Sequence, residues 1–192
     1  MAKKFEFGPD KPYSGLLSKL FLTTKQRKSL LKWALYCCVL LVLSVLQDVI
    51  LCDVRLFGAT TELVPCAIFL ICLLEGTQSG SVFSLVASLV YLFSGTAPGI
   101  YAMVFITVIS IGICIFRQSF LQKGFGTAIL CTCTAILLYQ LAVFLFGLFL
   151  GLTIPARIVG FLITALLSMI VVPALYPVLL SIESIGGETW KE

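Results

Sequence analysis

Five carboxylates outside the polar ends of the chain are the residues best suited to acid–base chemistry. They are Asp48, Asp53, Glu62, Glu75 and Glu183. We expect the first three at one membrane surface and the last two at the other, because all five fall at the ends of apolar segments. Paired carboxylates can act as general acid and base only where they converge, and a solvated membrane rim is the better interpretation here. The sequence has no histidine and no recognisable nucleophile or phosphate-loop motif, so we predict no catalytic residues and no enzyme.

The eight cysteines do not predict a metal or disulfide site. Most of them fall inside apolar runs, where a thiol behaves as a small hydrophobic group. Cys131 and Cys133, in the C-x-C arrangement, would point to different sides of a helix. Without histidine to complete a zinc site, we predict no metal and no cofactor.

Small residues recur along the third apolar segment at every fourth position, so they share one helix face. This seam consists of Gly76, Gly80, Ser84 and Ser88, and Gly147 and Gly151 repeat the spacing in a later segment. In a bilayer, small residues let two helix backbones approach closely. The seam therefore predicts either packing within the chain or a groove for a partner's helix. Gln140, near the middle of its segment, is a further candidate for an interhelical or partner contact.

The composition of the chain indicates that its apolar segments lie in a lipid bilayer. Hydrophobic residues make up 60% of the 192-residue chain and charged residues 11%, with a mean hydropathy of +1.12. Soluble domains carry about 25% charged residues. A compact soluble fold of this size could not hide the excess apolar surface, which must therefore face lipid. We predict an all-α, polytopic membrane bundle of about six transmembrane helices.

The six predicted spans follow from the apolar runs and their breaks. They are Leu30–Leu51, Leu63–Leu74, Ser81–Ser94, Ile100–Phe116, Phe125–Leu152 and Ile158–Ile182. The second and third are short, and form either a tight hairpin among longer helices or one broken helix. We favour the hairpin, because a single helix would place Glu75 near the bilayer centre at a cost of a few kcal/mol.

Basic residues are concentrated at one end of the chain. Eight of the thirteen lie in the first 32 residues: Lys3, Lys4, Lys11, Lys19, Lys25, Arg27, Lys28 and Lys32. Under the positive-inside rule this predicts a cytoplasmic basic tail over 1–29, the bundle over 30–182, and a cytoplasmic tail over 183–192. A short interfacial helix is expected at Ser14–Leu22. The clustering fits membrane orientation better than nucleic-acid binding.

The chain resembles MreD, the small membrane subunit of the bacterial rod-shape system, or elongasome. The matching motifs extend over about Leu40 to Leu180: Leu46-Gln47, Leu56-Phe57-Gly58, Leu63-Val64-Pro65, Leu73-Leu74-Glu75-Gly76, Gly80, Leu89 to Gly95, Gly99, Leu138 to Leu141, and Pro173 to Pro177. It departs from the family where Ser84 and Ser88 replace glycines, where an acidic residue is missing near Leu92, and where Gln140 replaces an acid.

The resemblance implies a non-enzymatic scaffold in the bacterial plasma membrane. Such a scaffold binds the single-span protein MreC and works with the glycosyltransferase RodA, its transpeptidase partner and the MreB filament in peptidoglycan synthesis and cell shape. It also implies a fold similar to the S-components of energy-coupling-factor vitamin transporters. The alternative is therefore a substrate-binding S-component or another small transporter, which would need an outward polar pocket built from groups such as Gln47, Asp48, Glu62 and Arg157.

Overall fold

A computed structural model describes residues 24–51, 59–95, 97–120 and 124–185, all in or between helices. The predicted interfacial helix at Ser14–Leu22, most of the two predicted tails, Asp53 and Gly58 lie outside the described residues. The bundle is therefore defined over the described ranges alone.

The described elements confirm a helical bundle. In chain order they are α1 (Thr24–Leu46), the π-helical turn η2 (Gln47–Leu51), α2 (Leu63–Glu75), α3 (Thr77–Phe93), α4 (Ile100–Phe120), α5 (Phe125–Phe149), the 3₁₀ turn η3 (Pro155–Arg157) and α6 (Ile158–Ile185). Four stretches are long and apolar enough to cross a membrane: Gln26–Val49, Ile100–Gln118, Phe125–Phe149 and Pro155–Ile185. Helices α2 and α3 are shorter, so six crossings remain a prediction.

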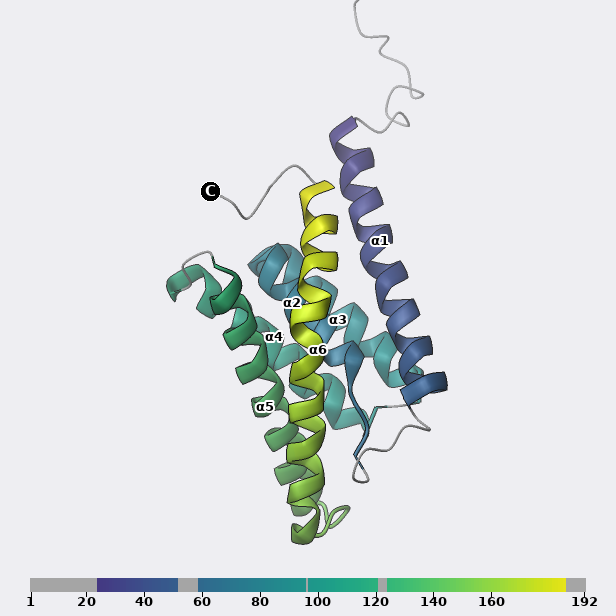
Figure 1. The fold of residues 1–192 in the computed structure, drawn as a ribbon, viewed down its shortest axis with the longest axis vertical. Helices are drawn as coiled ribbons and strands as arrows, with labels where there is room; N and C mark the ends of the chain where they lie inside the picture. Colours follow the sequence, from purple (N-terminus) through teal and green to yellow (C-terminus); the bar gives the residue numbers. More distant parts are fainter. Residues whose placement is uncertain (1–23, 52–58, 96, 121–123, 186–192) are drawn as a thin grey trace, which may run out of the picture.

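Helix α2 is the centre of the bundle. It contacts α1, α3, α4, α5 and α6, and every residue from Leu63 to Leu74 is buried. A helix that is apolar all round is stable only where protein or lipid surrounds it completely. At about 20 Å it is too short to cross a hydrocarbon core of about 30 Å alone. The longer helices around it supply that enclosure (Figure 1).

The predicted hairpin is present as two helices that pack against each other. Gly76 joins α2 to α3 with φ of +86°, a conformation that glycine adopts without strain. The start of α2 and the end of α3 lie at the same level, since Val64 and Tyr91 line one groove. Helix α3 buries Ser84, Ser88 and other small residues and exposes residues such as Val86. Apolar side chains such as Val82, Val86 and Val90 therefore face outward, as lipid contact requires, whereas Phe83 is buried.

Gly147 and Gly151 lie where α5 ends. They form a Schellman motif, in which Leu152 N–H donates to Gly147 O at 2.9 Å. Gly151 has φ of +70° and is exposed, and the Cβ of a larger residue at Gly147 would lie 2.9 Å from Thr153 Oγ1. The four-residue spacing of these glycines belongs to the end of a helix. Sequence periodicity alone cannot distinguish such a helix end from a face that packs against another helix.

Both chain ends of the described part lie at one end of the bundle. Figure 1 shows the start of α1 and the end of α6 together, with the α5–α6 connection at the opposite end. Large apolar side chains such as Val42, Phe93 and Leu166 are exposed over the outer surface. This surface is what a multi-pass membrane protein presents to lipid.

Candidate functional site

Two polar clusters mark the two ends of the buried helix α2. Glu75 lies at its C-terminal end and Glu62 immediately before its first residue. The sequence placed these acids at opposite surfaces, and the structure places them at opposite ends of α2. Their surroundings differ, and the difference decides what each can do.

Glu75 is neutralised by an ion pair. Its Oε1 lies 2.6 Å from Nζ of Lys32 on α1, and the two side chains are 7% and 11% exposed. Glu183 of α6 is 4% exposed, and Lys32, Glu75 and Arg117 all act on it electrostatically. Four helices thus bring two acids and two bases together, a balanced set that removes the cost of burying charge alone.

The sequence predicted Glu75 and Glu183 at the same surface but missed their basic partners. It treated Lys32 and Arg117 only as charges that orient the chain. The signal that could have found the pair was the position of Lys32, which lies inside the predicted span Leu30–Leu51 and so needs a partner or a route to the interface.

Glu62 is held at the meeting point of three elements. Its backbone N–H donates to Ser168 Oγ of α6 at 3.1 Å. The next two N–H groups, of Leu63 and Val64, donate to Gln47 Oε1 at 2.9 and 3.2 Å. Gln47 from η2 therefore caps the N-terminus of α2. Glu62 is the N-cap residue of α2, but its side chain makes no capping hydrogen bond.

The Glu62 carboxylate is directed toward α5. Burial raises its pKa to about 7, against a smaller opposite effect of Gln140 and Tyr139, which favour the charged form. Glu62 Oε2, Tyr139 Oη and Gln140 Nε2 are all buried, and none has a hydrogen-bond partner of good geometry in the described part of the chain. Asp48 lies on η2 and Asp53 lies outside the described residues, so the predicted clustering of the three acids stays a prediction.

The small-residue seam faces the inside of the bundle. Ser84 and Ser88 are fully buried, and Ser88 Oγ lies 3.0 Å from Thr107 Oγ1 on α4. A Cβ at Gly80 would lie 3.1 Å from Cys72 Cα and 3.2 Å from Cys114 Sγ. The seam thus joins α3 to α2 and α4, the first of the two alternatives that the sequence left open. Gln140, beside Glu62, also faces inward.

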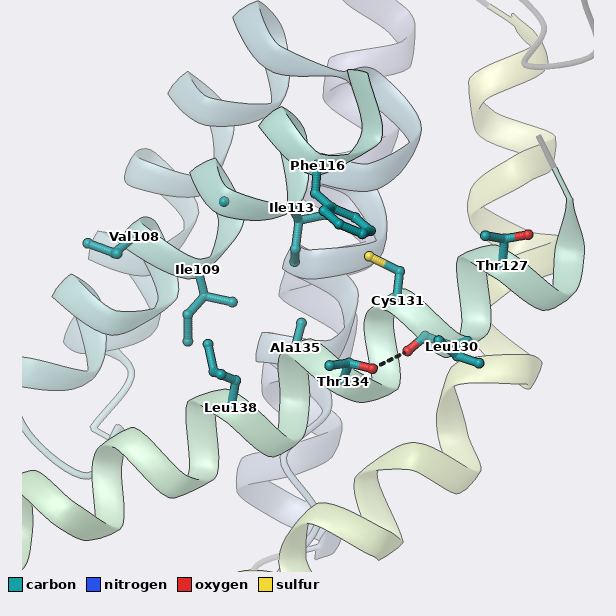
Figure 2. A pocket seen from close by; sticks show the side chains of 11 residues that line it. Val108, Ile109, Ile113, Phe116, Thr127, Leu130, Cys131, Thr134, Ala135 and Leu138 are labelled. Atoms are coloured by element: carbon teal, nitrogen blue, oxygen red, sulfur yellow. Dashed lines mark hydrogen bonds between the residues drawn. The ribbon is translucent and has the colours of Figure 1, made fainter. Parts of the chain in front are cut away.

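A groove lies on the outer surface between α4 and α5. It encloses about 580 Å³ and is lined almost entirely by apolar and small side chains. Figure 2 shows the α4 side chains Ile109, Ile113 and Phe116 facing Cys131, Ala135 and Leu138 of α5. Gly112 also lines the groove, and a Cβ there would meet no atom within 4 Å.

Comparison of the chain with protein-family models, with curated proteins and with solved structures found no match. Function therefore has to be inferred from the chain's own residues.

Proposed function

We propose that this chain is a non-catalytic scaffold of the bacterial plasma membrane that belongs with MreD. In this role it binds the single-span protein MreC and helps to organise the peptidoglycan synthases, including RodA and its transpeptidase partner, for cell shape. MreB and membrane lipid are the expected cytoplasmic and bilayer contacts. The proposal rests on the sequence resemblance, the charge distribution and the groove between α4 and α5.

The charge distribution supports cytoplasmic chain ends. With six crossings, the segments at the α1-start end of the bundle carry eleven of the thirteen basic residues, and the opposite segments carry Arg55 and Arg157. Basic residues in short loops are retained on the cytoplasmic side. The α1-start end is therefore the cytoplasmic end in this proposal.

The groove between α4 and α5 is the observation that carries the partner proposal. Its walls combine an unobstructed glycine, Gly112, with the small residues Thr127, Cys131, Thr134 and Ala135. Small residues on both walls allow a third helix to approach the two backbones closely, and the resulting dispersion attraction exceeds that of disordered lipid tails. We assign the groove to the transmembrane helix of MreC.

The arrangement of the ionisable groups supports a non-catalytic role. Glu75 and Lys32 form an ion pair, and neither lines the groove between α4 and α5 or the groove between α1 and α3. The substrate-binding alternative needs an outward polar pocket, whereas the grooves between α4 and α5 and between α1 and α3 are apolar. Gln47, one of the residues proposed to line such a pocket, is already engaged in capping α2.

Co-purification in mild detergent tests the partner proposal. The full chain is co-expressed with MreC, and the complex is quantified by pull-down and native mass spectrometry. Gly112→Leu fills the groove and should reduce recovered MreC about tenfold, equivalent to about 1.4 kcal/mol. Gly160→Leu is the matched control, because its Cβ also meets no atom within 4 Å but lies on α6, outside the groove.

Three outcomes would contradict the proposal. A complex unchanged by Gly112→Leu would show that MreC does not occupy the groove. Equal loss with Gly160→Leu would indicate a general effect of an added leucine. A wild-type chain that carries a small ligand and no MreC would favour the transporter alternative.

A further inference from the structure

We propose that the groove between α1 and α3 holds one acyl chain of a membrane phospholipid. The groove encloses about 220 Å³ and is lined along residues 37–44 of α1 and residues 83–91 of α3, with Val64 of α2 also in its lining. Such a site requires only that the chain lies in a membrane. It therefore exists whether or not MreC binds between α4 and α5.

The groove lies at the depth of the hydrocarbon core. At a rise of about 1.5 Å per residue, Cys37 and Ser44 lie about 10 and 21 Å beyond Leu30, where the first predicted span begins. The hydrocarbon core of a bilayer is about 30 Å thick. An occupant of the groove is therefore apolar along its whole length, as an acyl chain is and a lipid headgroup is not.

The groove is too small for a transmembrane helix. Its volume of about 220 Å³ is less than half of the 580 Å³ between α4 and α5. Trp33 and Tyr36 of α1 close one end, because their ring centroids lie 5.3 and 6.1 Å from that of Phe83 on α3. Beyond the other end, Gln47 accepts a hydrogen bond from Leu63 N–H of α2. Since α1 is attached on both sides of the groove, the groove cannot widen to admit a helix without breaking one of these contacts.

The dimensions agree with an extended hydrocarbon chain. The α3 wall between Phe83 and Tyr91 is about 12 Å long, from the helical rise per residue. An extended single-bonded chain advances about 1.2 Å per bond, so the wall matches about ten methylene groups. A methylene group takes up about the volume of a water molecule, about 30 Å³, so the volume of the groove holds about seven. Both estimates are within the length of one ordinary acyl chain.

The groove opens toward the surrounding lipid. Leu41, Val86 and Val90 are exposed at its rim, whereas Phe83 and Ala87 are buried. An acyl chain can enter sideways from the bilayer while its headgroup remains at the membrane surface. Inside the groove it contacts three helices, and these dispersion contacts hold it more firmly than mobile lipid tails would. The bound phospholipid should therefore remain when the surrounding lipid is removed.

Native mass spectrometry of the purified full chain in mild detergent tests the proposal. The unmodified chain should retain one phospholipid after the surrounding lipid has been exchanged for detergent. Val86→Phe narrows the groove at its rim and should lower the fraction of chains that carry a phospholipid about fivefold, because fewer dispersion contacts remain. Val82→Phe is the matched control, since Val82 is equally exposed to lipid one turn earlier on α3 and does not line the groove.

A phospholipid with a photoactivatable diazirine in its acyl chain locates the site. Cross-links should concentrate on residues 37–44 and 83–91, and Gly112→Leu in the groove between α4 and α5 should leave them unchanged. Recovery of MreC should in turn be unchanged by Val86→Phe, so failure of this site and failure of the MreC groove are distinguishable.

Four results would overturn the assignment. The first is an unmodified chain that retains no phospholipid, and the second is equal retention in Val86→Phe and Val82→Phe. The third is cross-links spread evenly over the outer surface. The fourth is a dimer that Val86→Phe dissociates, which would assign the groove to a second copy of the chain.

Discussion

Each end of α2 carries one carboxylate, and the two carboxylates have different surroundings. At the C-terminal end Glu75 pairs with Lys32 across 2.6 Å, with Glu183 and Arg117 nearby. At the N-terminal end, the described neighbours of Glu62 include Tyr139 and Gln140 of α5 and Ser168 of α6. The C-terminal end therefore joins opposite charges from two helices, whereas the described neighbours at the other end are a hydroxyl, a phenol and an amide.

This difference separates a fixed structural contact from one that responds to its environment. The ion pair between Lys32 and Glu75 joins two helices through opposite charges. Burial raises the pKa of Glu62 to about 7, so its charge changes near neutral pH. The predictions below test this contrast, from the largest expected effect to the smallest.

Lys32→Met should have the largest effect. It leaves Glu75 buried without its cation, and breaking a buried pair in this way costs roughly 3–5 kcal/mol. Thermal unfolding in detergent measures the loss. Lys28→Met is the control, because Lys28 is exposed on the same helix. The double variant Lys32→Met/Glu75→Leu should recover most of the stability. Equal behaviour of Lys32→Met and Lys28→Met would show that the pair contributes nothing.

Stability should fall as pH rises from about 4.5 to about 7. The folded-state pKa of Glu62 is raised to about 7 from its ordinary value of 4.5, so the folded chain binds more protons than the unfolded chain in this window. The stabilising effect is complete below pH 4.5 and is lost by about pH 7, a change of up to about 3 kcal/mol. Melting temperatures across this range measure it. In Glu62→Gln this part of the slope should vanish, and an unchanged slope would assign it to other groups.

Gly80→Leu should destabilise the ion-paired end by about 1–3 kcal/mol. Its Cβ would approach the Cys72 backbone at 3.1 Å, and the rest of the side chain would have to displace α2 or α4. Gly112→Ala is the contrasting variant, since the space around Gly112 is open and alanine favours a helix by up to about 1 kcal/mol. If chemical denaturation ranks Gly80→Leu as the more stable of the two, the seam is not packed as described.

Ser168→Ala should have the smallest effect, about 1 kcal/mol, because it removes one acceptor for the Glu62 N–H. The same variant should also make hydrogen exchange at the start of α2 faster, which links the loss to the Glu62 end. Ser181→Ala is the control, since Ser181 is exposed and its hydroxyl donates to Pro177 O within α6. A larger effect in the control would remove Ser168 as an anchor of α2.

The two ends of α2 also show how far the sequence could go. The predicted ranges for the six helices match the described helices within about six residues, and the predicted break near Glu75 separates α2 from α3. The sequence could not decide whether the small-residue seam packs within the chain or binds a partner. Helical spacing shows that residues share one face of a helix, but it does not show which element contacts that face. Gly147 and Gly151 illustrate the same limit, since their spacing belongs to a helix end.

The sequence by itself determined the helical segments, their breaks and the need for lipid, because hydropathy and chain-breaking residues act locally along the chain. Only the tertiary structure decided which polar groups meet. Glu62 contacts Ser168 across 106 positions, and Glu75 meets a lysine that belongs to a different helix, α1. Nothing in the local composition distinguishes the two glutamates. Their different chemistry follows from which helices pack against each end of α2.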